Sequence, residues 1–582
     1  MCGIQLQVWT EQSSSRWEDF YREHGSILRN RGPDHCQMVD ATKHFYSCRS
    51  VQLRASVLQM RHELIPQPVQ IKDDMYLCWN GEIYESNLPS SQDEEQHEEL
   101  WEYETSDTLI VKEALKVALL EQTIGDDIDD GRNIGNAIAQ VMSKLHNAEF
   151  ACLILTKDNI YYCRDNWGRR SLLRWNCPDG SGSFQIASTA EISTSDAENK
   201  SYNQDDKEEK EDGQEWTEIP PGAVYRIHIG GEDGTMSTSV IPFSSSSSLL
   251  SPPSSNSILP SVVPPTPPDG VSTELWQASF VLEDCLRQAV KMRLDQHAPS
   301  AVLFSGGLDS AVVAALAAAE QTATSTADQK HQQLYLYNVS FGPTFEKSND
   351  RKAALVTAGM LKDRYQDTKD ILFQDIVVDW EDIQKYEPHI RTLLQPKNTL
   401  MDVNIGIALW FASRGSVDGD ENDVYPDGEN RIRSPRALLL GMGADEQLGG
   451  YGRHRKAFDK GGWGRLKEEL DMDQARFWER NLGRDDRICA DHGKEARFPF
   501  LDANVVNFLK GLPLDQICDF SLPPGEGDKR ILRLVAARLG LDHASGLVKR
   551  AIQFGSRISH LSDAKRFGSR RKAKGEASVK SK

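Results

Sequence analysis

The chain has 582 residues, with 87 acidic and 67 basic side chains, a net charge of −20 and an isoelectric point near 5.2. This length predicts more than one hydrophobic core. The acidic balance argues against a general binder of nucleic acid or of anionic membranes. No apolar run approaches the ~18 residues that cross a bilayer, and no secretory signal is recognisable, so we expect a cytoplasmic protein.

The first part of the chain is rich in short apolar runs, which are typical of strands, interrupted by two segments with apolar residues at helical spacing. We predict strands at residues 4–9, 75–79, 151–156 and 160–164, and helices at 107–120 and 137–145.

A serine- and proline-rich segment at 244–270 then interrupts the pattern. Such a composition cannot bury enough apolar area to offset the chain entropy, so it predicts a linker. Blocks of acidic residues at 93–104, 126–130, 205–215 and 418–429 predict solvated inserts. The domain prediction is an N-terminal domain at 2–240, a linker at 241–273, a second domain at 274–564 and a basic tail at 565–582.

After the linker, helices and strands alternate, which predicts a parallel sheet with helices on both faces. The predicted elements are a helix at 274–294, a strand at 301–304, a helix at 310–319, a strand at 334–341, a helix at 400–413 and a strand at 437–440.

A glycine-rich turn, Ser305-Gly306-Gly307-Leu308-Asp309-Ser310, lies between a predicted strand and a predicted helix. Glycines let the backbone approach an anion, and the helix N-terminus attracts phosphate. Asp309 would repel phosphate unless a cation lay between them, so the turn indicates pyrophosphate plus magnesium. The alternative is an ordinary glycine-rich turn. The motif resembles the pyrophosphate loop of ATP-pyrophosphatase ligases.

A second glycine-rich turn begins at Gly441 and contains Gly443 and Asp445. Together with the segment 495–502, EARFPFLD, it resembles the synthetase domain of the asparagine synthetase family. The resemblance implies the following roles: ATP contacts by Ser305, Gly306, Gly307, Asp309, Ser310, Phe341, Gly441, Gly443 and Lys529, Mg²⁺ binding by Asp309 and Asp445, and catalysis by Lys549.

Cys2 becomes the N-terminal residue once Met1 is removed, which brings a thiol and a free amine together. On its own, a cysteine at this position is more often an accident. Three further segments change that interpretation, because RGPD at 31–34, NGEIY at 80–84 and SDT at 106–108 resemble motifs of class II glutamine amidotransferases. The resemblance implies the following roles: Cys2 as nucleophile, Asn80 and Gly81 as the oxyanion hole, and Glu82 and Asp107 as glutamine ligands.

The two resemblances together imply an α/β protein in which an Ntn-type αββα sandwich precedes a Rossmann-like parallel-sheet ATP-pyrophosphatase domain. The order of the motifs is that of a glutamine-dependent asparagine synthetase, here with the inserts of a fungal-type eukaryotic member. The resemblance implies glutamine, aspartate and ATP as substrates, ATP and Mg²⁺ as cofactors, and asparagine as product. The sequence is compatible with a homodimer but does not decide the oligomeric state.

Two positions depart from the family pattern. Met442 replaces a glutamate in the second glycine-rich turn, and a thioether can neither accept a proton nor carry charge. Leu58 occupies the place of an arginine that clamps the glutamine carboxylate, a role that falls here to Arg54 or to Arg61; we assign it to Arg54. These departures leave two alternatives open: an impaired pseudo-synthetase with a regulatory or scaffold role, or a ligase that adenylates another carboxylate.

Overall fold

The computed structural model describes residues 2–10, 27–42, 49–61, 63–72, 74–88, 106–122, 131–177, 181–190, 216–230, 236–243, 266–295, 298–320, 332–366, 369–397, 399–415 and 435–567. The four predicted acidic inserts, residues 244–265 of the predicted linker and residues 568–582 of the predicted basic tail lie outside the described residues.

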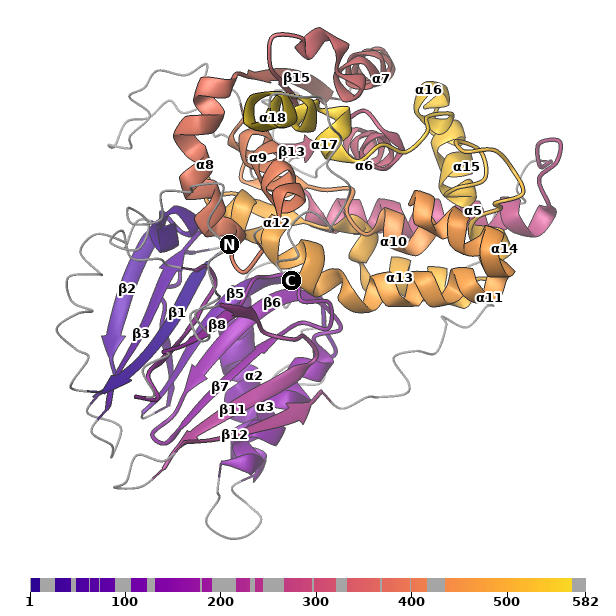
Figure 1. Cartoon of the computed structure of the whole chain (residues 1–582). Helices are drawn as coiled ribbons and strands as arrows, with labels where there is room; N and C mark the ends of the chain where they lie inside the picture. Colours follow the sequence, from indigo (N-terminus) through magenta and orange to yellow (C-terminus); the bar gives the residue numbers. More distant parts are fainter. Residues whose placement is uncertain are drawn as a thin grey trace, which may run out of the picture.

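Two antiparallel six-stranded sheets form the first part of the chain (Figure 1). One sheet has the order β10-β8-β9-β1-β3-β2, built from β1 (Gly3–Thr10), β2 (His35–Asp40), β3 (Arg49–Val57), β8 (Leu173–Asn176), β9 (Phe184–Ala187) and β10 (Thr217–Glu218). The other has the order β12-β11-β7-β6-β5-β4, built from β4 (Val69–Lys72), β5 (Met75–Glu85), β6 (Asn147–Leu155), β7 (Asn159–Arg164), β11 (Ala223–Ile229) and β12 (Met236–Pro242).

The two sheets pack face to face, and helices cover the outside of the second sheet. Alternation along the strands sends Ile4 and Leu6 of β1 and Leu153 of β6 into one apolar layer between the sheets. Helices α2 (Asp107–Gln122) and α3 (Arg132–Lys144) bury their apolar faces against the opposite face of the second sheet. On the first sheet, a helical turn at 27–31 is held by a hydrogen bond from Ser56 Oγ to the carbonyl of Leu28. The predicted sandwich of α/β class is confirmed.

A five-stranded, entirely parallel sheet forms the second part, with the order β15-β14-β13-β16-β17. Its strands are β13 (Ser300–Leu303), β14 (Gln332–Phe341), β15 (Lys369–Val378), β16 (Ala437–Leu439) and β17 (Glu495–Arg497). The chain moves outward from β13 in both directions, so a topological switch point lies at the carboxyl end of β13. Ligands of such sheets bind at that point.

Helices cover both faces of the parallel sheet, as the alternating sequence pattern predicts. One face is covered by α5 (Thr273–Arg293), α6 (Leu308–Ala319), α7 (Asn349–Tyr365) and α15 (Arg530–Arg538), and the other by α8 (Trp380–Leu394), α9 (Leu400–Arg414) and α12 (Gly483–Ala490). The remaining elements are η4 (Phe345–Lys347), α10 (Ala444–Leu448), α11 (Gly452–Phe477), η5 (Trp478–Leu482), η6 (Pro499–Leu501), α13 (Ala503–Gly511), α14 (Leu514–Ile517), α16 (Asp542–Ser545), α17 (Ile552–Gly555) and α18 (Ile558–Phe567). Within the described ranges, every helix is too short or too polar to span a membrane.

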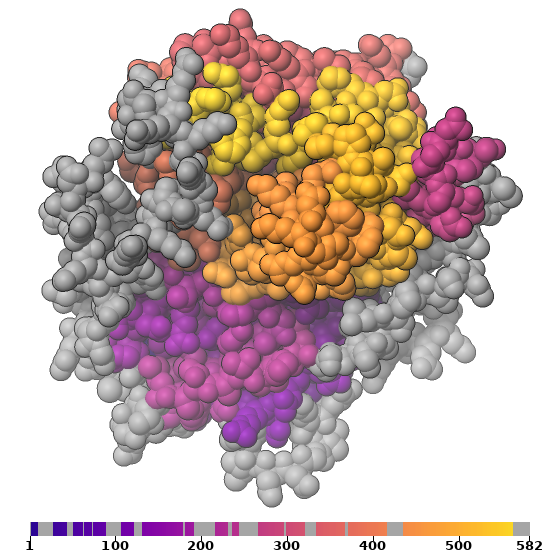
Figure 2. All heavy atoms as spheres, turned by 45° about the vertical axis from the view of Figure 1, so that its right-hand side comes forward, coloured from indigo at the N-terminus to yellow at the C-terminus, as the bar shows by residue number. Residues whose placement is uncertain are grey.

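The two parts of the chain are in direct contact, and on the face shown in Figure 2 their surfaces meet along a continuous boundary. Buried ion pairs cross this boundary. Arg31 Nη2 lies 2.8 Å from Asp486 Oδ2, and Arg293 Nε lies 3.1 Å from Glu149 Oε1. Arg31 belongs to the RGPD segment, so this part of the motif holds the two halves together.

Candidate active sites at two sheet edges

The thiol of Cys2 lies at the start of β1, next to β5 of the second antiparallel sheet. The backbone nitrogen of Cys2 donates to Asn80 Oδ1 at 2.8 Å, and Gln67 Nε2 lies 3.8 Å from Cys2 Sγ. Cys2 is buried, and this burial raises the pKa of its thiol. The thiol is therefore neutral at pH 7, and it needs a base to become a nucleophile.

Asn80 and Gly81 follow each other on β5, beside Cys2. Asn80 is fully buried, and its Nδ2 has no hydrogen-bond partner among the described residues. A buried donor without a partner costs about 1–3 kcal/mol, so this amide is available to a ligand oxygen. Packing also requires a glycine at position 81, since a Cβ there would lie 2.5 Å from the carbonyl oxygen of Glu149.

One pocket is lined by Cys2, Gly81, Glu82 and Asp107, so four of the predicted amidotransferase residues share one site. Asp107 Oδ2 accepts a hydrogen bond from the backbone nitrogen of Ile83 at 3.2 Å. Burial and the neighbouring Glu82 charge raise the pKa of Asp107. A cationic group in this pocket would favour the ionised form of Asp107, as the α-ammonium of an amino acid would do.

The structure does not bring Arg54 to this pocket. Arg54 lies on β3, where its Nη2 is 3.8 Å from the Sδ of Met38 on the neighbouring strand. Arg61, the other candidate from the sequence, lines the pocket, and its Nε lies 3.1 Å from Glu82 Oε2. Leu58 lines the same pocket. Spacing placed Leu58 at the clamp position, and Arg54 was expected to reach the site from a neighbouring turn. Arg54 instead lies inside β3 between the buried Leu53 and Ala55, so the alternation of the strand turns its side chain to the other face of the sheet.

Gln67 was not anticipated from the sequence. Its Oε1 accepts from the backbone nitrogen of Trp79 at 2.6 Å, while its Nε2 reaches Thr108 Oγ1 at 3.2 Å. The same Nε2 faces Cys2 Sγ, so Gln67 fixes the segment beside the thiol. It lies in an irregular stretch without apolar periodicity, where no sequence signal marks it.

The glycine-rich turn after β13 lies at the switch point of the parallel sheet. Ser305 and Asp309 line two adjoining pockets there. Gly306 has φ of 71°, and a Cβ at this position would lie 2.2 Å from the backbone nitrogen of Ala354 in α7. Ser310 Oγ donates to the carbonyl of Gly307 at 3.2 Å. The turn is thus pressed against α7 and presents the N-terminus of α6 to the pockets.

Two carboxylates and two ammonium groups meet beside this turn. Lys529 Nζ lies 2.6 Å from Asp309 Oδ1 and 2.5 Å from Asp445 Oδ1. Lys549 Nζ lies 2.5 Å from Asp445 Oδ2 and 3.7 Å from Asp309 Oδ2. Burial by itself would raise the pKa of Asp445, but the two ammonium groups more than offset it and lower the pKa. The Asp445 carboxylate is therefore ionised at neutral pH, and it faces the same two ammonium groups as Asp309.

The Lys529 ammonium between Asp309 and Asp445 shows that these carboxylates can hold a cation. Magnesium is commonly bound by one or two carboxylates together with substrate phosphates. Within the described part of the chain, no group of three or more His, Cys, Asp or Glu side chains is placed to hold a metal alone. The donor set therefore fits Mg²⁺ that arrives with a phosphate ligand.

The wall opposite the charges is apolar and includes Tyr337, Val339 and Leu409. Gly441 and Gly443, which were predicted to contact ATP, line this pocket. A Cβ at Gly441 would lie 2.9 Å from Asp309 Cβ. The predicted adenine contact Phe341 does not line it. Phe341 is 1% exposed and packs edge-on against the ring of Phe411, with the ring centres 6.3 Å apart. β14 continues past the pocket, so its last residue is covered by α9.

Met442 lines the same pocket, beside two carboxylic acids that the sequence analysis did not single out. Tyr451 Oη donates to Glu446 Oε1 at 2.5 Å, and burial together with the charge of Asp445 raises the pKa of Glu446. Burial also raises the pKa of Asp350 to about 7. Asp350 lies in the first turn of α7, two residues after the N-cap Ser348. An acidic side chain at a helix N-terminus stabilises the helix, so its position in the sequence did not indicate a functional site.

Comparison with known proteins identifies relatives over nearly the whole chain. The family model described as Asparagine synthase matches residues 281–386 and 429–545. The asparagine synthetase domain-containing protein 1 of Gallus gallus is 31% identical, covering 96% of this chain and 97% of the relative. The Homo sapiens protein of the same name is 29% identical, with 96% and 95% coverage.

A relative in Saccharomyces cerevisiae, also described as an asparagine synthetase domain-containing protein, is 27% identical over 87% of this chain and 83% of its own. Among solved structures, the allosteric regulatory enzyme of purine biosynthesis aligns over 64% of this chain and 80% of its own, with 14% identity. The TM-score of that alignment is 0.27, which is too low to bear on the fold.

Proposed function

The chain belongs to the family of asparagine synthetase domain-containing protein 1, and from this relationship we propose that it is a glutamine-hydrolysing asparagine synthase. In this proposal residues 2–240 form the amidotransferase domain and residues 274–564 the synthetase domain. Glutamine, aspartate and ATP are the substrates. Asparagine, glutamate, AMP and pyrophosphate are the products.

In the first site, the thiol of Cys2 attacks the side-chain amide carbon of glutamine after its proton passes to the free α-amine. Asn80 Nδ2 and the Gly81 N–H stabilise the oxyanion that forms, an arrangement worth roughly 3 kcal/mol per donor. Asp107 and Glu82 hold the glutamine α-ammonium, and Arg61 replaces Arg54 as the partner of its carboxylate. Ammonia leaves, and water releases glutamate from the Cys2 thioester.

In the second site, the turn from Ser305 to Ser310 and the loop with Gly441 and Gly443 bind the pyrophosphate of ATP. Asp309 and Asp445 would hold Mg²⁺, which would neutralise charge on the phosphates. Lys529 and Lys549 bind the α-phosphate and the leaving pyrophosphate as the aspartate side-chain carboxylate displaces pyrophosphate. Ammonia then attacks the acyl adenylate, and AMP leaves.

The observation that carries this proposal is the position of Cys2. A nucleophile at the second residue of the chain is useful only if its amine is in reach and an oxyanion donor stands beside it. Here the backbone nitrogen of Cys2 lies 2.8 Å from Asn80 Oδ1, while Asn80 Nδ2 is buried and unpaired among the described residues. A structural cysteine needs neither feature.

The test is a product assay on the full chain with glutamine, ATP and aspartate. We expect equal amounts of asparagine, glutamate and pyrophosphate. Absence of glutamate release from glutamine, in protein whose Cys2 amine is shown to be free, would refute the amidotransferase assignment.

Met442 favours a second candidate, an impaired synthetase with a regulatory or scaffold role. It lines the pocket beside Asp309 and Asp445, at a position where the family pattern has a glutamate. Met442→Glu run beside the native chain distinguishes the two, with Met472→Glu on the exposed surface of α11 as the matched control. Asparagine formed only by Met442→Glu favours the impaired enzyme. Pyrophosphate formed by the native chain with a carboxylate other than aspartate favours a third candidate, a ligase for that carboxylate.

A further inference from the structure

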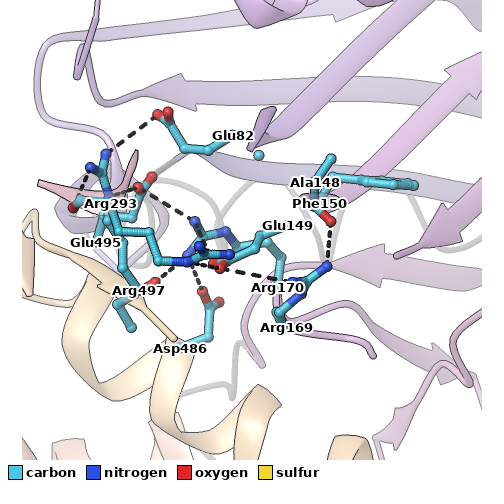
Figure 3. Close-up of polar contacts among 12 residues, drawn as sticks. Glu82, Ala148, Glu149, Phe150, Arg169, Arg170, Arg293, Asp486, Glu495 and Arg497 are labelled. Atoms are coloured by element: carbon cyan, nitrogen blue, oxygen red, sulfur yellow. Dashed lines mark hydrogen bonds and ion pairs between the residues drawn. The ribbon is translucent and has the colours of Figure 1, made fainter. Parts of the chain in front are cut away.

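Arg497 lies between the two sites, on the edge strand β17 of the parallel sheet. Its side chain is 1% exposed and belongs to a buried network of charges from both halves of the molecule (Figure 3). Arg497 Nε donates to Glu495 Oε1 at 2.7 Å, and Nη1 donates to the carbonyl of Arg293 at 2.9 Å. Two of its three nitrogens are thus fixed within the second part of the chain.

The third nitrogen of Arg497 faces the glutamine pocket. Arg497 Nη2 lies 3.8 Å from Glu82 Oε1, while the other oxygen of Glu82 lies 3.1 Å from Arg61 Nε. Glu82 lines the pocket with Cys2, two residues after Asn80. A charge-assisted N–H···O bond is about 2.7–2.9 Å long, so the Arg497–Glu82 pair is about 1 Å looser than a hydrogen bond. One carboxylate is therefore shared unequally between two guanidinium groups.

The backbone of Arg497 is connected to the nucleotide site. Its carbonyl accepts from the backbone nitrogen of Leu440 at 2.9 Å, and its Cα is the register partner of Leu439 in β16. Leu440 is followed directly by Gly441, where the loop that lines the ATP pocket begins. One backbone hydrogen bond therefore joins Arg497 to the residue that precedes this loop.

We propose that Arg497 is a positioning residue that couples occupancy of the glutamine pocket to the arrangement of the loop beginning at Gly441. The inference rests on the proposed function, because it assumes that the two pockets bind glutamine and ATP. A ligand ammonium beside Asp107 and Glu82 redistributes Glu82 between Arg61 and Arg497. The distance between Arg497 and Glu82 then changes, and the hydrogen bond from Leu440 to the Arg497 carbonyl passes this movement to the loop that begins at Gly441. The two pockets therefore bind their ligands cooperatively.

Arg170 provides a matched control within the same network. It is fully buried, its Nη2 lies 3.4 Å from both Glu149 Oε2 and Glu495 Oε1, and its Nη1 donates to the carbonyl of Ala496 at 2.7 Å. Arg170 lines neither pocket. It shares Glu495 Oε1 with Arg497, so Arg170→Lys disturbs the same buried charges but leaves the Glu495 anchor of Arg497, the Arg497–Glu82 pair and the hydrogen bond to Leu440 in place.

The experiment uses the full chain with Cys2→Ala, so that glutamine binds without turnover. The dissociation constant of glutamine is measured with and without Mg²⁺ and α,β-methylene-ATP, and the constant of the nucleotide with and without glutamine. Linkage requires the same factor in both directions, and coupling factors are typically 5–150. We expect a factor of at least 5 in the parent and in Arg170→Lys. In Arg497→Lys we expect a factor below 2, with each separate affinity within about threefold of the parent.

A parent without coupling, or an Arg497→Lys protein whose coupling equals that of the parent, overturns the inference. If Arg497→Lys does not fold, Glu495→Gln takes its place, because it preserves volume and weakens the 2.7 Å anchor of Arg497; unchanged coupling there has the same meaning. If the parent binds neither ligand, the proposed function itself fails. That result is distinct from binding without coupling.

Discussion

The two candidate sites differ in how their functional groups are held. Around Cys2, the close contacts are a backbone N–H, a carboxamide of Asn80 and a carboxamide of Gln67, all neutral. Beside the turn after β13, Asp309, Asp445, Lys529 and Lys549 contact one another as full charges. The first site has an unpaired donor that waits for a ligand. The second has its binding groups paired with each other, so a ligand must separate them.

The surroundings of the Cys2 thiol and the charged cluster therefore depend on their ligands in opposite ways. The groups that surround the thiol are preorganised, so the amide of a substrate fills a place already formed, whereas the Arg61–Glu82 pair of the same pocket rearranges when a ligand binds. In the second site, phosphates bring negative charge to Lys529 and Lys549, and a divalent cation brings positive charge to Asp309 and Asp445. The metal would replace the two lysines as the partner of the aspartates, and the phosphates would replace the two aspartates as the partner of the lysines. We therefore expect nucleotide and metal to bind together.

Replacing Cys2 by alanine separates the sites most completely. Loss of the nucleophile should lower glutamate release from glutamine by at least about 10³-fold, while asparagine formation from free ammonia, ATP and aspartate stays within twofold. Measurement of both products in the same protein checks this expectation. Cys36→Ala, at the exposed cysteine of β2, is the control. Equal loss of both activities would show that the sites are not separable.

The reverse separation is expected from Lys549→Ala. Without this ammonium, the charge that develops on the phosphates is less stabilised, and pyrophosphate release should fall about 10²–10³-fold with either nitrogen source. Glutamate release from glutamine alone should continue. Lys467→Ala is the matched control, since that lysine is 63% exposed on α11. Normal pyrophosphate release by Lys549→Ala would remove Lys549 from the catalytic group.

Asn80→Ala tests whether the groups around the Cys2 thiol are preorganised for the reaction. Removal of the unpaired Asn80 Nδ2 should lower kcat for glutamine hydrolysis about 10²-fold and change KM little, because in the proposed reaction Nδ2 contacts the developing oxyanion and Oδ1 contacts the nucleophilic residue Cys2. Steady-state kinetics separate the two constants, with Asn87→Ala on the exposed segment after β5 as control. An increase in KM at unchanged kcat would make Asn80 a ground-state binding residue.

A substitution at Lys494 measures how much a buried charge without a carboxylate partner lowers the stability of the second part. It is 5% exposed, donates to the carbonyl of Arg414 at 3.2 Å, and forms no ion pair with the carboxylates the structure describes. Burial lowers its pKa from 10.5 to about 8. The folded state therefore binds fewer protons than the unfolded state between these values, and stability rises as the pH increases from 8 to 10.5.

Lys494→Met should accordingly be more stable than the native chain at pH 7, by about 1–3 kcal/mol, with a smaller difference at pH 10. Denaturant unfolding at the two pH values measures this. Lower stability of Lys494→Met at pH 7 would show that the hydrogen bond to Arg414 outweighs the desolvation of the ammonium.

The sequence predicted those parts of the fold whose signals are local. Helix α6 and the turn before it follow from an apolar strand, glycines and an alanine-rich segment, and helix α9 begins at Leu400 as predicted. Strands β8 and β9 have only four residues each and were not predicted. They pair with each other, but their other neighbours, β10 and β1, lie far away in the chain, so their own pattern carries little information.

Among the candidate site residues, motif members such as Asp107 and Lys549 line the pockets, whereas Arg54 and Phe341 do not. The difference has a physical reason. A motif constrains the chain over a few residues, but the direction of Arg54 depends on the alternation along β3, a strand that was not predicted, and the exposure of Phe341 depends on its contact with α9. Gln67 and the Arg497–Glu82 pair depend on long-range packing that no local pattern encodes.

The buried ion pairs across the boundary have a consequence for how the molecule loses its structure. Arg487 Nη1 lies 2.7 Å from Glu218 Oε1, and Arg170 Nη2 lies 3.4 Å from Glu495 Oε1, and both pairs are buried. Breaking such a pair by removing one partner costs roughly 3–5 kcal/mol. An isolated half would expose several of these guanidinium and carboxylate groups without partners. Calorimetry of the whole chain should therefore record one endotherm in which both halves melt together.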